Sequence, residues 1–303
     1  MTWCDFFWTE QEKTWCEERS IHLLSVHDSS YPSLLAHIYD PPPGLAVDGD
    51  VTALSQGILV AIVGSRKPTS YGMQFATELA RDLSQRGATI VSGLAFGIDR
   101  AAHEGALNGG GKTVAVLASG IDDVTPRAHR SLAKRIQKQG AIVSEFSLGT
   151  PALPQHFPRR NRVISGLSHG VIVVEAAERS GSLITARCAL EQGREVFAVP
   201  GLPGSLQASG THHLIKNGAA LIESANDVME HLSHLPLVKM NNCIPEKAGQ
   251  FSEAPDKRAV FTLEMFATER SLKHQEAIQM LASMVLTGEV DELPGKRFVM
   301  KGA

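Results

Sequence analysis

Residues 156–170, HFPRRNRVISGLSHG, place an aromatic ring beside concentrated positive charge. The residues that could bind a ligand here are Phe157, Arg159, Arg160, Asn161 and Arg162. Guanidinium groups track phosphates while an aromatic ring stacks on a base, and proteins hold single-stranded nucleic acid in this way. A duplex hides its bases, so the pattern favours a single strand. The alternative is a basic turn with Phe157 in the core and the arginines paired to Glu145 or Glu175.

A second candidate anion site lies in AIVGSRKPTSYG, where an apolar run leads into Gly64, Ser65 and Arg66. The pattern predicts a strand, a tight turn and then a helix that begins near Gly72. Backbone amides at such a turn, together with the helix dipole, bind anions, and Arg66 would add a positive fork. We therefore expect a phosphate here. The alternative is a tight turn that carries a surface arginine.

A third candidate is Ser180, Gly181 and Ser182 in VVEAAERSGSLITARCAL. These residues precede a predicted helix whose first amides, with the hydroxyls of Ser182 and Thr185, could receive a phosphate or a ribose oxygen. The alternative is an ordinary helix cap. The role of Glu175 stays open between capping an arginine, holding a sugar hydroxyl and acting as a base.

Asp99 and His103 lie four residues apart on one predicted helical face in SGLAFGIDRAAHEGAL. They could be an acid and base pair or a structural hydrogen bond. With Glu175 and the serines, they allow an alternative function, a nucleotide or phosphoribose hydrolase on a related Rossmann-like fold. Against it, the P-G-G-x-G-T-x-x-E signature of nucleoside-monophosphate phosphoribohydrolases is replaced by ERSGSLITA. A purely structural adaptor would leave the Phe157–Arg162 cluster without a role.

The elements that must position these residues read as an α/β fold. Apolar runs with strand character alternate with amphipathic stretches, at residues 58–64, 88–93, 112–119, 141–146, 170–176, 195–201 and 219–224. Strands this apolar need helices on both faces, so we predict a Rossmann-like, doubly wound, mostly parallel sheet. Residues 56–234 would form this domain.

The remaining segments are expected to be accessory. Residues 1–55 carry few strand signals and contain Pro41, Pro42 and Pro43, which favour an extended connector, so we expect a lead-in packed on the next domain. Residues 235–257 lack an apolar face and read as a linker. Residues 258–303 suggest a small winged-helix module, with helices in AVFTLEMFATE and HQEAIQMLASMVLTG and two short strands joined at Pro294-Gly295.

Composition limits the possible classes. The chain has 303 residues, 43% of them hydrophobic, and a formal net charge of -3, so a nucleic-acid site must be a local patch. The four cysteines are scattered without zinc spacing, which predicts neither a disulfide nor a metal site. We find no signal peptide and no run long enough to cross a bilayer, so we expect a cytoplasmic protein without membrane contact.

Taken together, the motifs resemble the DNA-processing protein A family, also called DprA or Smf. The resemblance runs from about Tyr31 to the end through YPSLLAHIYDPPPGL, AIVGSR, SGLAFGID, PRAHRSLAKRI, SEFSLGTPALPQHFPRRNRVISGLS, VVEAAERSGSLITA and EVFAVPG with GTHHLIKNGA. It implies a homodimer that binds single-stranded DNA, bypasses single-strand-binding protein and recruits RecA recombinase in natural transformation. It implies no cofactor and no covalent chemistry. Arg66 and the Phe157–Arg162 segment would line the DNA pocket, with Ser180, Gly181 and Ser182 at its edge. The N-terminal SAM-like domain of many members is expected to be absent or vestigial.

Overall fold

The computed structural model describes residues 8–233, together with residues 260–262, 280, 284, 290–293 and 297–300. The chain divides into two compact units, Met1–Cys243 and Ile244–Ala303, and each is described by itself.

Within the described part of the first unit, nine strands form one sheet in the order β1-β2-β6-β5-β4-β3-β7-β8-β9. Neighbouring strands from β6 to β9 pair in parallel, whereas β1 pairs with β2 and β2 with β6 in antiparallel fashion. The strands are β1 (His22–Ser25), β2 (Gly44–Gly49), β3 (Leu59–Val63), β4 (Thr89–Ser92), β5 (Thr113–Val116), β6 (Ala141–Ser144), β7 (Gly170–Val173), β8 (Glu195–Ala198) and β9 (Ala220–Leu221). The predicted α/β class with a mostly parallel sheet is confirmed.

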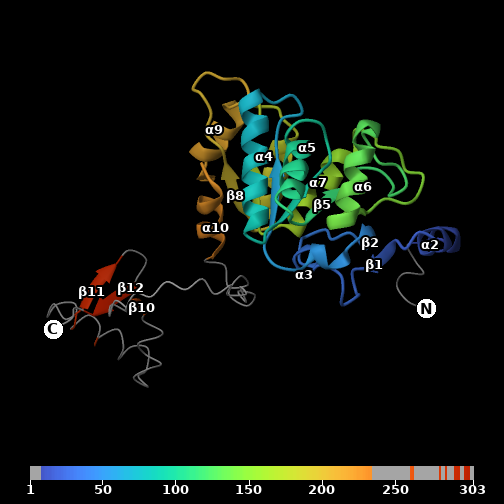
Figure 1. Cartoon of the computed structure of the whole chain (residues 1–303), viewed down its shortest axis with the longest axis horizontal. Coiled ribbons are helices and arrows are strands. Elements are labelled where there is room, and N and C mark those ends of the chain that lie inside the picture. The colour runs from blue at the N-terminus through green and yellow to red at the C-terminus, as the bar shows by residue number, and fades with distance from the viewer. Residues whose placement is uncertain are drawn as a thin grey trace. The chain divides into compact units, whose positions relative to one another are not determined.

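Helices cover both faces of this sheet (Figure 1). They are α2 (Glu10–Glu17), α3 (Ser33–Ala36), α4 (Ser70–Gln85), α5 (Ile98–Asn108), α6 (Arg130–Gln139), α7 (His156–Leu167), α8 (Ser182–Glu191), α9 (Ser209–Lys216) and α10 (Ala225–Ser233), with short 3-10 turns at Val51–Leu54 and Arg127–His129. α3, α7 and α8 pack on one face, and α4, α5 and α10 pack on the other.

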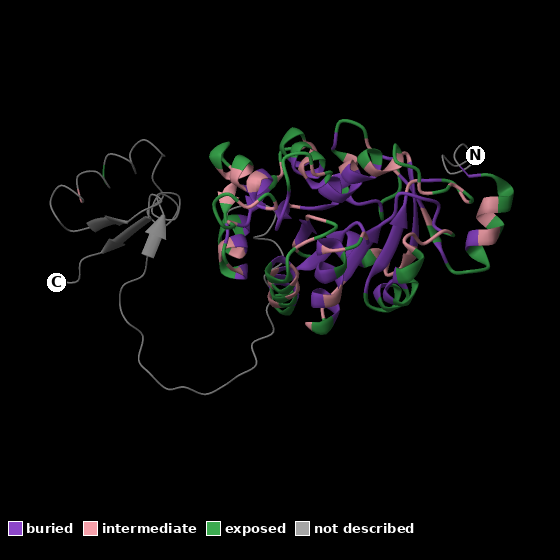
Figure 2. Cartoon of the chain, turned by 90° about the horizontal axis from the view of Figure 1, so that it is seen from above, coloured by how far each residue is buried: buried purple, intermediate pink, exposed green. Residues whose placement is uncertain are grey.

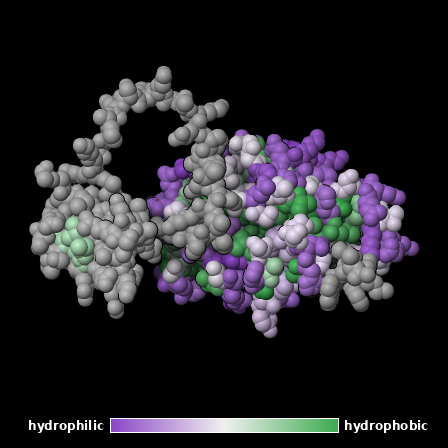
Figure 3. Space-filling view, turned by 90° about the horizontal axis from the view of Figure 1, so that it is seen from below, coloured by the Kyte–Doolittle hydropathy of each residue, from purple (hydrophilic) through white to green (hydrophobic). Residues whose placement is uncertain are grey.

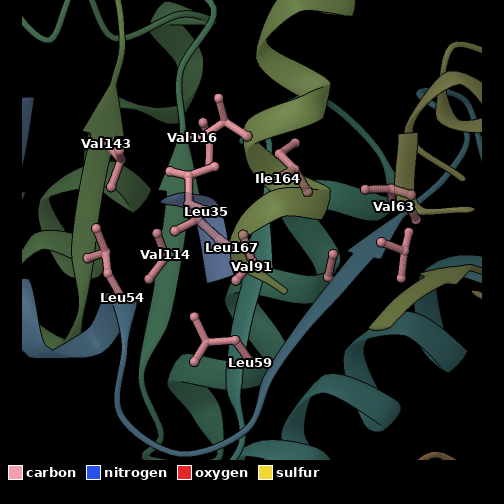
Figure 4. Close-up of a cluster of buried hydrophobic side chains, with 14 of the residues drawn as sticks. Leu35, Leu54, Leu59, Val63, Val91, Val114, Val116, Val143, Ile164 and Leu167 are labelled. Carbon is pink, nitrogen blue, oxygen red and sulfur yellow. The ribbon is translucent and has the colours of Figure 1, made fainter. Parts of the chain in front are cut away.

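Alternating residues of each central strand face the two helix layers, as the pleat requires. In β3, Leu59, Ala61 and Val63 join the core beneath α7 and α8, while Val60 and Ile62 join the core beneath α4 and α5. Figure 4 shows part of the first core, including Leu59, Val63 and Ile164. In Figure 2 the strands are buried and the outer faces of the helices are exposed. The face drawn in Figure 3 is mostly hydrophilic with hydrophobic residues between, as is ordinary for a protein surface.

Residues 1–55, which carry few strand signals in the sequence, nevertheless contribute two strands to the sheet. β1 and β2 lie in this segment and extend the sheet beyond β6, with Val47 opposite Val143. The three prolines lie directly before β2 and do not interrupt it. Because these strands are short and antiparallel, they lack the long apolar run that marks the parallel strands.

In the second unit, three described strands pair antiparallel in the order β10-β12-β11. These are β10 (Val260–Thr262), β11 (Val290–Leu293) and β12 (Arg297–Met300). The last two confirm the strands predicted around Pro294-Gly295, whereas Val260–Thr262 is a strand where the sequence suggested a helix. The linker and most of both predicted helices lie outside the described residues, so the winged-helix assignment stays a prediction.

Across the residues that the structure describes, no helix is long and apolar enough to cross a membrane. The same residues contain no cluster of three or more histidine, cysteine or acidic side chains that could hold a metal ion.

Candidate functional site

The order of the strands creates a crevice at the carboxyl ends of β3 and β7. From β3 the chain proceeds through β4, β5 and β6 on one side, and from β7 it proceeds through β8 and β9 on the other. The loops after these two neighbouring strands therefore diverge, and ligands of doubly wound sheets bind at such a point. A cavity of about 640 Å³ lies there.

Most of the sequence-predicted site residues meet around this cavity. Its lining includes Gly64, Ser65, Arg66, Phe157, Arg160, Asn161, Ser180, Gly181 and Ser182. Arg159 and Arg162 are not part of the lining. Arg179, which the sequence analysis did not select, is exposed and also lines the cavity. It stands directly before Ser180, so the same loop signal could have indicated it.

Arg66 and Phe157 form one wall of the cavity. The Arg66 guanidinium carbon lies 4.7 Å from the centroid of the Phe157 ring, a cation–π contact. Arg66 is exposed and Phe157 is partly exposed in the first turn of α7, so the ring is not a core residue. Among the described residues, neither Arg66 nor Arg179 forms an ion pair. Both positive charges therefore remain available to an anionic ligand.

Arg160 lies under the cavity and is buried. Its Nη1 donates to the carbonyl oxygens of Gly93 at 2.7 Å and Val116 at 2.6 Å, which joins the ends of β4 and β5 to α7. Burial lowers the pKa of Arg160 to about 10, and the nearby Asp99 carboxylate opposes this shift. Arg160 therefore fixes the cavity floor as well as adding charge.

Arg159 and Arg162 instead bind Glu145, as the alternative reading of this segment proposed. Arg162 Nη2 lies 2.5 Å from Glu145 Oε2, and Arg159 Nε lies 3.2 Å from the same oxygen. Arg162 also donates to the carbonyl oxygen of Asp40. Burial raises the pKa of Glu145, and the two arginines act in the opposite direction. This cluster ties α7 to the segment before β2.

The other side of the cavity is built from the starts of two helices. The residue at the N-cap position makes no side-chain cap hydrogen bond in either α7 or α8, but the Ser182 amide at the start of α8 donates to the Ser180 hydroxyl oxygen at 3.4 Å. Asn161 Nδ2 donates to the Gly181 carbonyl oxygen at 3.3 Å and so ties the two helices together. The Ser180 and Ser182 hydroxyl oxygens lie 2.7 Å apart. Such helix ends attract phosphates.

The start of α4 lies near Gly72, as predicted. The helix begins at Ser70, with Thr69 as its N-cap. Glu175 accepts hydrogen bonds from the Thr69 backbone amide at 2.9 Å and from its hydroxyl at 2.5 Å. A Cβ on Gly72 would lie 2.5 Å from the Glu175 carboxyl carbon, so glycine is needed there. The carboxylate of Glu175 thus takes the place of an anion at this helix.

Asp99 and His103 do not form a pair. Asp99 accepts hydrogen bonds from the amides of Gly93 at 3.2 Å and Ala95 at 3.4 Å, and burial raises its pKa. His103 is buried behind the cavity, where its Nδ1 lies 2.7 Å from the Thr113 hydroxyl oxygen. Burial lowers the pKa of His103 to about 3. Both residues support the structure of α5 and its neighbouring strands.

A second, smaller hollow of about 140 Å³ lies on the other side of the Arg66–Phe157 wall. Its lining includes Phe96, Ala118, Pro126 and Ala152, and it shares Arg66, Phe157 and Arg160 with the first cavity. Phe96 is 50% exposed and makes an edge contact with His129, with ring centroids 4.8 Å apart. The sequence analysis did not select Phe96, which lies in the loop between Gly93 and Gly97.

The loop that carries Phe96 is held in an unusual conformation. Leu94 has a φ of 57°, which is uncommon for a residue with a branched side chain. Gly97 has a φ of 79°, and a Cβ there would collide with the Ser65 carbonyl oxygen. The loop after β4 is therefore pressed directly against the loop after β3.

Comparisons with known proteins give a consistent match. Residues 22–233 match the family model described as DNA recombination-mediator protein A. Protein Smf of Escherichia coli is 41% identical over 297 residues, which cover 94% of this chain and 79% of that protein. DNA processing protein DprA of Bacillus subtilis is 46% identical over 236 residues, which cover 78% of this chain and 75% of that protein.

Two solved structures resemble this one over most of their length. That of DNA processing protein A from Streptococcus pneumoniae has a TM-score of 0.68 at 42% identity and covers 72% of this chain and 77% of its own. That of DNA processing protein A from Helicobacter pylori, titled for its single-stranded DNA binding mode, has a TM-score of 0.63 at 31% identity. It covers 69% of this chain and 98% of its own.

Proposed function

Because the chain belongs to the DNA recombination-mediator protein A family, we propose that it binds single-stranded DNA in the cavity at the carboxyl ends of β3 and β7. The contact between Arg66 and Phe157 carries the proposal. It places an unpaired guanidinium and a partly exposed ring on one wall, where a phosphate and a base of the same strand can be held. The structure of DNA processing protein A from Helicobacter pylori, which was described for its single-stranded DNA binding mode, supports this choice.

The residues around the cavity have different roles in this proposal. Arg66 and Arg179 meet phosphates, and Phe157 stacks on a base. The Ser180-Gly181-Ser182 turn at the start of α8, whose residues line the cavity, receives a second phosphate. Gly64 and Ser65 are small, so the protein backbone can come close to the DNA strand at these residues. Arg160 and Asn161 hold these groups in place from below.

We propose that the protein performs no covalent step on the DNA. Of the residues that could have formed an acid and base pair, His103 binds Thr113 and Glu175 binds Thr69, while Asp99 lines the cavity but accepts hydrogen bonds from two backbone amides. This weakens the alternative of a nucleotide or phosphoribose hydrolase, which needs such groups free in the cavity. A screen of nucleotides and phosphoribosyl compounds for turnover would reveal that alternative directly.

Beyond binding, we propose that the protein acts in the cytoplasm as a homodimer in DNA recombination and natural transformation. It would deliver the single strand to RecA recombinase in the presence of single-strand-binding protein. Membership of the family supports this role. It would be tested by RecA filament assembly on DNA coated with single-strand-binding protein, with and without this protein, and by light scattering for the dimer.

The DNA-binding proposal is tested by fluorescence anisotropy of a labelled oligothymidine and of a duplex across a salt titration. We expect tight, salt-sensitive binding that prefers the single strand and falls with Arg66→Ala. Arg86→Gln is the matched control, because Arg86 is an exposed cation at the end of α4, away from the cavity. Equal binding of both oligonucleotides, or equal loss with the control, would contradict the proposal.

A further inference from the structure

The basic surface of α6 and the turn before it stands apart in a chain whose net charge is -3. Five exposed cations lie on it, and in the described part of the chain none of them has an ion pair or a side-chain hydrogen bond: Arg127, Arg130, Lys134, Arg135 and Lys138. α6 itself contains no acidic residue. We call these five residues the α6 basic face.

These charges do not serve the fold. The helix packs on the sheet through Leu132, Ala133 and Ile136 on its other side. Arg130, Lys134 and Lys138 repeat every four residues, so like charges stand above one another and weaken the helix. Arg130 also lies in the first turn, where the helix dipole disfavours a cation. A surface that opposes the stability of its own helix is consistent with selection for an anionic partner.

The α6 basic face is continuous with the smaller hollow. Thr125 and Pro126 line that hollow, and Arg127 follows them directly in the chain. Phe96, at the rim, contacts His129, which lies between Arg127 and Arg130. Asp122 is the one exposed acidic residue between the hollow and the helix. Its carboxylate oxygens accept hydrogen bonds from the Gly149 amide at 3.0 and 3.1 Å. Cations and one aromatic ring thus lead from the hollow onto α6.

We propose that single-stranded DNA leaving the cavity passes over Phe96 and continues along the α6 basic face. This inference rests on the proposed function. α6 connects the parallel strands β5 and β6, so it runs from the cavity edge of the sheet toward the opposite edge. Arg127 and Arg130 are therefore the first cations that the strand meets, and Lys138 is the last. A single strand rather than a duplex is the partner, because a ring at the entrance can stack only on an unpaired base.

The length of α6 sets the expected footprint. Ten residues span about 15 Å at 1.5 Å per residue. The rise of about 3.4 Å per nucleotide within a stacked duplex is a lower bound for a single strand, so this length corresponds to at most roughly four further nucleotides. A strand that fills only the cavity would not reach the α6 basic face, whereas a longer strand would. Oligonucleotide length therefore separates the two parts of the site.

The test compares oligothymidines of about 6 and about 20 nucleotides by anisotropy across a salt titration, using the full chain. The variant is Arg130→Gln with Lys134→Gln. Its matched control is Arg86→Gln with Lys216→Gln, which removes the same charge from exposed positions at the ends of α4 and α9. A third variant, Phe96→Ala, is paired with Phe96→Trp.

We expect the α6 double variant to weaken binding of the long oligonucleotide about tenfold at low salt and to reduce its salt slope by about 1.4. The short oligonucleotide and the control should be unaffected. Phe96→Ala should weaken binding of the long oligonucleotide without changing the salt slope, and Phe96→Trp should bind it as tightly as the wild type. No variant should lower the melting temperature, and the α6 double variant should raise it slightly because it removes like charges from the helix.

Three outcomes would overturn the inference. The long oligonucleotide could bind the α6 variant as tightly as it binds the wild type. Binding of both lengths could be weakened equally, or the control variant could lose as much affinity as the α6 variant. Failure of the proposed function is a different result, since wild type would then bind neither length. If wild type binds the short strand but gains nothing with length, only the path along α6 is refuted.

Discussion

The Arg66 guanidinium lies over the face of the Phe157 ring, so the loop after β3 and the first turn of α7 meet in one cation–π pair. Each group orients the other at the cavity wall, and the wall separates two hollows. A ligand that contacts one residue of the pair is therefore expected to be affected by a change in the other.

The pair should behave as one unit in binding. We expect Phe157→Ala to cost about 1 to 3 kcal/mol of single-strand affinity with little change in salt slope. Arg66→Ala should weaken binding and reduce the slope by about 0.7. The double variant should lose less than the sum, because each single change already disturbs the partner. Anisotropy measures all three, and a fall in thermal stability without loss of affinity would instead place Phe157 in the core.

The arginines of α7 should differ in what they do. Arg159→Ala should change single-strand affinity by less than about twofold, because this side chain binds Glu145 outside the cavity lining. Arg162→Ala should leave the Glu145 carboxylate buried without its closest partner and lower the free energy of unfolding by about 3 kcal/mol. Chemical denaturation and anisotropy on the same samples separate these effects. A strong loss of affinity with Arg159→Ala would bring it back into the DNA site.

Arg160 should be needed for stability before it is needed for binding. Arg160→Ala removes the donor to Gly93 and Val116 and leaves the buried Asp99 without its stronger cationic neighbour, so we expect a loss of about 3 to 5 kcal/mol. Arg160→Lys should recover part of it. Urea denaturation gives the result, and unchanged stability would show that Arg160 is not the support described above.

Glu175 should act as a helix cap. We expect Glu175→Ala to lower stability by about 1 to 2 kcal/mol and to leave oligothymidine affinity unchanged, since its oxygens bind Thr69. Gly72→Ala should cause a similar loss by displacing the same carboxylate. A large change in affinity with normal stability would assign Glu175 to the ligand site.

His103 predicts a dependence of stability on pH. Its pKa falls from 6.5 to about 3 in the folded state, so below pH 6.5 the unfolded chain binds a proton that the folded chain excludes. Stability contributed by neutral His103 is complete above pH 6.5 and is lost as the pH falls toward 3. The slope should be at most about 1.4 kcal/mol per pH unit. His103→Gln should flatten this slope in denaturation curves measured between pH 7 and 4.

The central sheet could be predicted from the sequence because both faces of its parallel strands are buried. All seven apolar runs became strands β3 to β9. β1 and β2 were not predicted, because an antiparallel pair at one side of the sheet needs no continuous apolar run. The start of α4 at Ser70 agrees with the predicted start near Gly72, but the contact of its N-cap Thr69 with Glu175, a residue far away in the sequence, could not be predicted.

The site could be predicted in part for a similar reason. Residues directly after parallel strands or at helix starts must gather at the carboxyl edge of the sheet, so Arg66 and Ser180 could be found from their position. The pairing of Arg159 and Arg162 with Glu145 was one of two open readings, because the sequence gives no distances. Phe96 and the second hollow depend on how the loop after β4 folds over β3, which no local pattern encodes.

The divergence of the chain at β3 and β7 also couples DNA binding to the folding of the sheet. Gly64 and Ser182 come from distant parts of the chain and meet at the cavity only when the central strands have paired. Partly unfolded forms therefore have no such cavity, and bound oligonucleotide adds its binding energy to the stability of the native state. At a free strand concentration one hundred times the dissociation constant, this gain is about 2.7 kcal/mol. The protein should then resist heat and proteolysis best while it is carrying DNA.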